Sequence, residues 1–248
     1  MNTNEDLQVA PHSAPSKSWV DRIQALFEVL LLAGLVSGLL AELPFAVSAL
    51  GLERLLGNIR LMSAYLLLEA AISFLFLFLV MRAHGETLQG FGLSWVRWRS
   101  NVLIGLAIVP VLFVLNIVVS TIFQAFFPQY FQERNPLMEL IRSPQDLIIL
   151  IGTALIAGGV KEELQRAFIL RRFQVYLGGA NLGLILWSVA FGLGHSLQGT
   201  QGMFVAGLFG MIFGIVYLAR NSLVAPIVAH GAYDTIALLG YWMFTAHK

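Results

Sequence analysis

The sequence predicts an all-α fold, a polytopic membrane helix bundle with about seven transmembrane helices. Of the 248 residues, 58% are hydrophobic and only 12% are charged, and the mean hydropathy is +0.78. A soluble domain carries roughly twice that charged fraction. The apolar residues are also gathered into runs of about 20 residues, the length at which a helix crosses a bilayer. Composition and pattern together indicate an integral membrane protein.

The charge balance and the cysteine count exclude several classes of function. The net charge is +1 and no basic stripe is present, so we expect no nucleic-acid partner. The chain has no cysteine, which excludes disulfides, thiolate metal ligands and a cysteine nucleophile. Residues 1–22 are polar, with Glu5 and Asp6, and lack the apolar core of a secretory signal. We interpret them as a disordered cytosolic tail.

The region 23–125 is expected to form the N-terminal transmembrane helices. Its apolar runs cover 23–50, 61–81 and 101–123. Pro44 is expected to kink or end the first helix, and Trp95 and Trp98, in the loop before the third, suit the headgroup level. The acids of these runs are isolated in the sequence, so this region is interpreted as peripheral or gating; they are Glu28, Glu42 and Glu69.

The region 147–245 is expected to form a second bundle, the catalytic core. Its apolar runs cover 147–173, 180–197, 201–219 and 223–244. Ser143-Pro144-Gln145-Asp146 is a helix start signal for the first of them. The connection 126–143 mixes aromatic and charged residues and is interpreted as a short amphipathic helix along the interface.

The distribution of Lys and Arg predicts a cytosolic N-terminus. With that orientation the cytosolic segments hold Lys17, Arg22, Arg82, Arg97, Arg99, Arg171, Arg172 and Arg220. The opposite side holds Arg54, Arg60, Arg134, Arg142 and Lys248. Arg171 and Arg172 are interpreted as interface anchors. Seven spans then place the C-terminus outside, and we expect a bacterial-type inner or plasma membrane.

A charged stretch interrupts the apolar pattern of the fourth run. Lys161, Glu162, Glu163 and Arg166 follow Gly158-Gly159 directly. Charged residues inside a membrane helix are costly and normally face a protein interior or a water-filled cavity. Two carboxylates beside a cation indicate an acid/base site, and a structural ion pair is the competing interpretation.

Two histidines lie in later runs. His195 ends Phe191-Gly192-Leu193-Gly194-His195, and His230 precedes Asp234 by four residues, so the last two share a helix face. A rise of about 1.5 Å per residue puts Glu162 and His230 at one depth and His195 deeper. Taken alone, each histidine is more simply a helix contact. Their co-occurrence with Glu162 favours a common site, and small residues in these runs allow close helix packing.

In this order the motifs resemble the CPBP family, the membrane-embedded CAAX proteases and bacteriocin-processing enzymes also called the ABI family. The family pattern is Glu-Glu-x-x-x-Arg, then Phe-x-x-x-His, then His-x-x-x-Asn or Asp. Phe191 to His195 matches the second motif, and His230 to Asp234 matches the third. The first motif is one residue short here, so alignment on Arg166 puts Lys161 at the family's first Glu, whereas Glu162 is a family Glu in either register.

The resemblance implies hydrolysis of peptide bonds inside the membrane. It assigns Glu162 as general base with His195, Glu163 as the second choice, His230 and Asp234 as the oxyanion-stabilising pair, and Arg166 and Phe191 as supports. The implied substrate is a membrane-anchored peptide or protein, with prenylated CAAX-type proteins among the candidates. No cofactor is expected; the alternative is zinc held by Glu162, His195 and His230. The competing functions are a transporter, an immunity-type binding protein and an inactive homologue.

Overall fold

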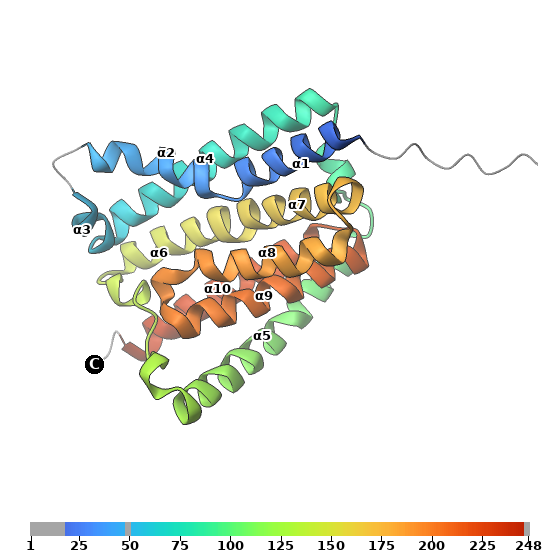
Figure 1. Cartoon of the computed structure of the whole chain (residues 1–248). Helices are drawn as coiled ribbons and strands as arrows, with labels where there is room; N and C mark the ends of the chain where they lie inside the picture. The colour runs from blue at the N-terminus through green and yellow to red at the C-terminus, as the bar shows by residue number, and fades with distance from the viewer. Residues whose placement is uncertain (1–17, 48–50, 246–248) are drawn as a thin grey trace, which may run out of the picture.

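The computed structural model describes residues 18–47 and 51–245, and all regular secondary structure within them is helical. This confirms the all-α prediction. Figure 1 shows the long helices side by side, with α4 and α5 at opposite edges of the bundle. The helices are α1 (Trp19–Leu32), α2 (Leu35–Ala46), α3 (Gly51–Leu56), α4 (Ile59–His84), α5 (Trp98–Phe126), α6 (Pro144–Thr153), α7 (Glu163–Tyr176), α8 (Ala180–Gly194), α9 (Gly199–Arg220) and α10 (Val224–Thr245).

Four helical segments are long and apolar enough to cross a membrane: Trp19–Ala46, Ile59–His84, Trp98–Phe126 and Ser196–Arg220. Helix α8 is apolar but shorter. The described chain is therefore that of an integral membrane protein. The count of about seven spans remains a prediction. The rod α6–α7, which contains charged residues, and α10, which contains His230 and Asp234, are not among the helices that meet the length and hydropathy criteria.

The first segment differs from its expected form at its start and in the middle. Helix α1 starts at Trp19, inside the expected tail 1–22, with Ser18 as its cap. Residues 1–17 and the expected end at 48–50 lie outside the described part. The break between α1 and α2 falls at Gly34, whose φ of +92° is a left-handed conformation that suits glycine. Pro44 lies inside α2 and does not make that break.

Residues 144–176 form one continuous helical rod that carries the charged stretch. The predicted start signal is confirmed, because the Ser143 side chain accepts a hydrogen bond from the Asp146 amide. Between α6 and α7 the rod widens into a π-helix, η4 (Ala154–Glu162). The connection before it contains only two 3₁₀ turns, η2 (Pro128–Tyr130) and η3 (Met138–Leu140), so the expected amphipathic helix there is wrong.

The core lies on the far side of the charged stretch, along α7. Ala167, Phe168 and Leu170 are fully buried there and pack with residues of α1, α4, α8 and α9. At the end of α7, the buried Arg172 donates to Glu28 of α1 at 2.6 Å and to Glu86 at 2.7 Å. The interpretations of Arg172 as an interface anchor and of Glu28 as an isolated acid are wrong, because each is the other's partner across the bundle.

Candidate active site

The two adjacent glutamates at the junction of η4 and α7 point to different places. The Glu162 side chain is partly exposed, at 19%, and lines a cavity of about 890 Å³. Its Oε2 has no hydrogen-bond partner among the described residues. The Glu163 side chain is fully buried and does not line that cavity. Of the two carboxylates, only Glu162 can reach a molecule in the cavity.

Glu163 belongs to a buried ion pair. Its carboxylate contacts the Arg166 guanidinium one turn later on α7, and both side chains are fully buried. The guanidinium also lies over the rings of Phe191, at 4.7 Å, and Phe213, at 5.5 Å. The interaction of a cation with ring faces is favourable where water is excluded. Arg166 and Phe191, the two expected supports, therefore contact each other.

His230 of α10 is held by this pair. Its Nδ1 donates to Glu163 Oε1 at 2.9 Å, and its ring stacks on Phe213 at 4.9 Å. The other nitrogen, Nε2, lies 3.6 Å from Asp234 Oδ2 and 3.9 Å from Glu162 Oε2. Glu163 thus fixes the ring so that Nε2 faces the cavity and the two carboxylates that line it.

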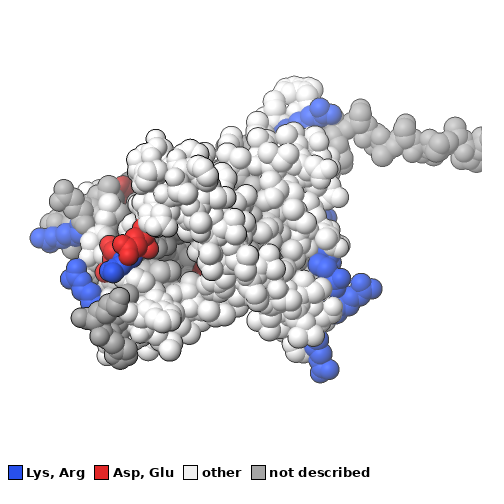
Figure 2. All heavy atoms as spheres, turned by 90° about the horizontal axis from the view of Figure 1, so that it is seen from below, with Lys and Arg blue, Asp and Glu red and all other residues white. Residues whose placement is uncertain are grey.

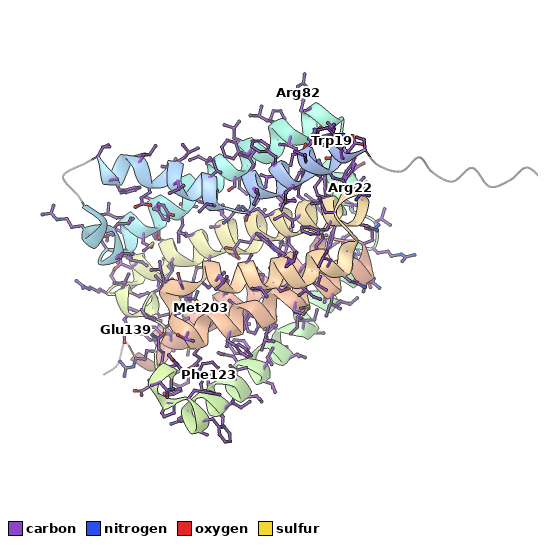
Figure 3. The ribbon with its side chains drawn as sticks, viewed as in Figure 1. Trp19, Arg22, Arg82, Phe123, Glu139 and Met203 are labelled. Atoms are coloured by element: carbon purple, nitrogen blue, oxygen red, sulfur yellow. The ribbon has the colours of Figure 1, made fainter. Side chains whose placement is uncertain are left out.

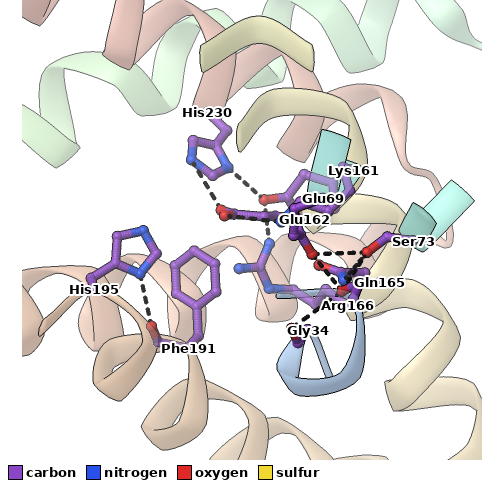
Figure 4. A network of polar contacts seen from close by, with 12 residues as sticks. Gly34, Glu69, Ser73, Lys161, Glu162, Gln165, Arg166, Phe191, His195 and His230 are labelled. Atoms are coloured by element: carbon purple, nitrogen blue, oxygen red, sulfur yellow. Dashed lines mark hydrogen bonds and ion pairs between the residues drawn. The ribbon is translucent and has the colours of Figure 1, made fainter. Parts of the chain in front are cut away.

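His195 follows the last residue of α8 and is fixed by its own helix. Its Nδ1 lies 2.8 Å from the Phe191 carbonyl oxygen, and because a carbonyl only accepts, Nδ1 carries the hydrogen. In the neutral ring Nε2 is then the acceptor. Figure 4 shows His195 and His230, from α8 and α10, on the same side of Glu162. All three side chains line one cavity, so the expected difference in depth does not separate them.

Glycines in η4 allow helix α10 to come this close. A Cβ at Gly158 would lie 3.1 Å from Asp234 Oδ2 and 3.4 Å from His230 Nε2, and one at Gly159 would lie 3.4 Å from the Gly231 Cα. A Cβ at Gly158 would therefore press on the site itself, and one at Gly159 would fill the remaining space up to α10. The π-helix ends at Glu162, and such segments are frequent at functional sites.

Lys161 forms a second polar group beside the site. Its Nζ lies 2.8 Å from Glu69 Oε2 of α4 and 3.7 Å from Glu162 Oε1. The other Glu69 oxygen accepts from Ser37 at 2.7 Å and from Ser73 at 2.9 Å. The interpretation of Glu69 as an isolated acid is wrong, and the N-terminal helices line the cavity. The signal was available, because a carboxylate inside an apolar span requires a partner.

The described residues do not bring three His, Asp or Glu side chains together in an arrangement that could hold a metal ion. This includes the alternative zinc set of Glu162, His195 and His230. These three side chains line a common cavity, and the zinc alternative remains a prediction.

One comparison with known proteins finds a match, and it covers the region of the site. Residues 143–236 match the family model described as type II CAAX prenyl endopeptidase Rce1-like. The match begins at the cap of α6 and ends in α10, so it contains all three motifs. It confirms the resemblance to the CAAX protease family and, with the apolar helices, supports a membrane protease. No curated protein and no solved structure matches the chain.

Proposed function

We propose that this protein is an intramembrane endopeptidase that hydrolyses peptide bonds of membrane-associated substrates, prenylated CAAX-type peptides among the candidates. One observation carries the proposal: Glu162, His195 and His230 line the same cavity, and each histidine is fixed through Nδ1 so that Nε2 is available. A cavity of this size accommodates a short peptide segment. The Rce1-like match supplies the reaction class.

In the proposed reaction Glu162 is the general base. A water held between Glu162 and His195 gives a proton to the Glu162 carboxylate as its oxygen attacks the scissile carbonyl carbon. Collapse of the tetrahedral intermediate breaks the C–N bond, and the proton passes from Glu162 to the leaving amine. Both carboxylate geometry and cavity access support Glu162 over Glu163, because Glu163 Oε1 is already occupied by Arg166 and His230.

His230 and Asp234 are proposed to stabilise the oxyanion. The Nε2 of a protonated His230 donates a hydrogen bond to the developing negative charge, and Asp234 at 3.6 Å orients that group. A carboxylate cannot donate unless it is protonated, so His230 is the donor in this scheme. Glu163 acts through His230 by fixing its ring and is a positioning residue.

The proposed mechanism uses no metal. It rests on Glu162 and His195, whose side chains line the cavity and can activate a water by general base catalysis. We expect activity to persist in a strong chelator and to gain nothing from added zinc. Loss of turnover in the chelator, with recovery on zinc addition alone, would contradict this part of the proposal.

The deciding experiment is cleavage of a panel of membrane-anchored and prenylated peptides by the purified protein. We expect turnover with the wild type and none with Glu162→Gln or His195→Ala. Undiminished turnover in Glu162→Gln would remove Glu162 as the base. If folded wild type cuts no peptide, with or without zinc, the chain is a non-catalytic binding homologue, as Lys161 in the motif allows.

A further inference from the structure

The charged residues divide the bundle into two unlike ends. Arg22 and Arg82 lie at one end and Glu139 at the other (Figure 3). We call the first the basic end, because among the described residues it holds Arg22, Arg82, Arg97, Arg99, Arg171, Arg172 and Arg220, at starts and ends of helices. The opposite end holds Arg54, Arg60, Arg134 and Arg142. Figure 2 shows acidic side chains beside a hollow at that opposite end.

The cavity of the candidate site opens at the end away from the basic end. Its rim is formed by the loop 132–138 and by the turn that follows α8, including Gly194 and Gln198. Apart from Phe213, the lining residues that α5, α8 and α9 contribute come from the halves of these helices that adjoin this loop and this turn. Toward the basic end the cavity stops at the buried core of α7, where Ala167 and Phe168 have no exposed surface.

The same two ends differ in what they present to a membrane. Lys and Arg gather on the cytosolic side of membrane proteins, and without the buried Arg172 the basic end still has six Arg against four among the residues described. Trp95 and Trp98 also lie there as an edge-to-face pair, with the Arg99 guanidinium 5.5 Å from the Trp98 ring. Tryptophan and arginine at one level are typical of the headgroup region. The basic end is therefore the cytosolic end.

We propose that the cavity opens to the non-cytosolic face of the membrane. Given the proposed function, the substrate is a polypeptide segment on that face, still attached to an apolar membrane anchor, and it enters past loop 132–138. Cytosolic proteins with a lipidated C-terminal tail would meet the closed, core-filled end. Loop 132–138 contributes Glu133 and Arg134 to the rim, so the arriving segment meets charges of both signs.

The chain contains no cysteine, so single introduced cysteines report access without background. Three exposed or open positions suit the test: Glu133→Cys on the rim, Gly194→Cys inside the mouth, where a Cβ meets nothing within 4 Å, and Gln89→Cys at the basic end. A membrane-impermeant maleimide is added to intact spheroplasts and, separately, to lysed ones. We expect Glu133→Cys and Gly194→Cys to be labelled in both, and Gln89→Cys only after lysis.

The reverse pattern, with Gln89→Cys alone labelled in intact spheroplasts, overturns the proposal. Labelling of Glu133→Cys without Gly194→Cys overturns it as well, because the cavity would then not open at that end. Glu139→Cys, also exposed beside the rim, replaces any rim variant that fails to fold. The labelling does not require catalysis, so it tests the direction in which the cavity opens even if the purified protein cuts no peptide.

Discussion

Glu162 and Glu163 are neighbours in the chain, yet one faces a cavity and the other the core, because successive helical residues point in different directions. The sequence left two interpretations, an acid/base site and a structural ion pair, and each of them applies to one of the two glutamates. The buried pair is Glu163 with Arg166. The carboxylate available for chemistry is Glu162, the residue that fits the family motif in either register.

This division predicts different outcomes for two isosteric changes. Glu163→Gln leaves the Arg166 charge buried without its partner, and breaking a buried pair in this way costs about 3–5 kcal/mol. Glu162→Gln changes a partly exposed group and should leave the thermal midpoint nearly unchanged while turnover is lost. Thermal unfolding in detergent and peptide cleavage measure the two effects. Equal destabilisation by both changes would contradict the division.

Lys161 and Glu69 give a second test at the residue level. Lys161→Met leaves the Glu69 carboxylate with only the hydroxyls of Ser37 and Ser73, so we expect a loss of about 3 kcal/mol. Adding Glu69→Gln should recover part of that loss, because the remaining group is neutral. A double-mutant cycle on thermal stability measures the coupling. Strictly additive losses would show that the pair is not coupled.

Motif spacing was sufficient to name the residues that meet in the cavity, since Glu162, His195, His230 and Asp234 were all expected. Motif spacing could not predict which residues form ion pairs with the charged side chains of the rod α6–α7. Lys161 meets Glu69, and Arg172 meets Glu28, across large separations in sequence. A local pattern contains no information on such pairs. It indicates only that an intramembrane charge must have a partner somewhere.

At the scale of elements, the π-helix η4 could not be anticipated. Hydrophobic periodicity is judged against the 3.6-residue repeat of an α-helix, whereas a π-helix bonds residue i to i+5. The segment Ala154–Glu162 ends at the charged stretch, where the motif is one residue shorter than the family pattern. The shortened motif and the π-helix thus occur at the same place in the chain.

Gly158 tests whether the site needs this close approach. In Gly158→Ala, the methyl group would lie 3.1 Å from Asp234 Oδ2 and 3.4 Å from His230 Nε2. The Asp234 side chain, or both side chains, must therefore shift. We expect turnover to fall at least about tenfold, because small displacements at a reacting centre are costly. Gly152→Ala on the same rod is the matched control, since nothing lies within 4 Å of its Cβ. Full activity of Gly158→Ala in the peptide assay would contradict the argument.

For the whole molecule, each of the seven expected apolar runs is mostly helical where the structure describes it, with the first run broken at Gly34, and the run lengths were sufficient to predict the helices. The role of the first three runs was not predictable. Two buried ion pairs join the first two of these runs to the rod α6–α7: Glu69 of α4 with Lys161 beside the cavity, and Glu28 of α1 with Arg172 near the basic end. Helices α1 and α4 are thus attached to the rod at two levels, and residues 33–38 and 62–69 line the cavity beside it.

The ion pair of Arg172 with Glu28, near the basic end, can be tested with the neighbouring Arg171 as a control. In Arg172→Met, the buried Glu28 loses its cation and Glu86 loses both of its close contacts to Arg172, so stability should fall by about 3–5 kcal/mol. Arg171 has a 40% exposed side chain and lies 3.8 Å from Glu86, so Arg171→Met should cost at most about 1 kcal/mol. Thermal unfolding compares the two. If the two methionine variants lose stability equally, Arg172 does not hold the N-terminal helices against the core.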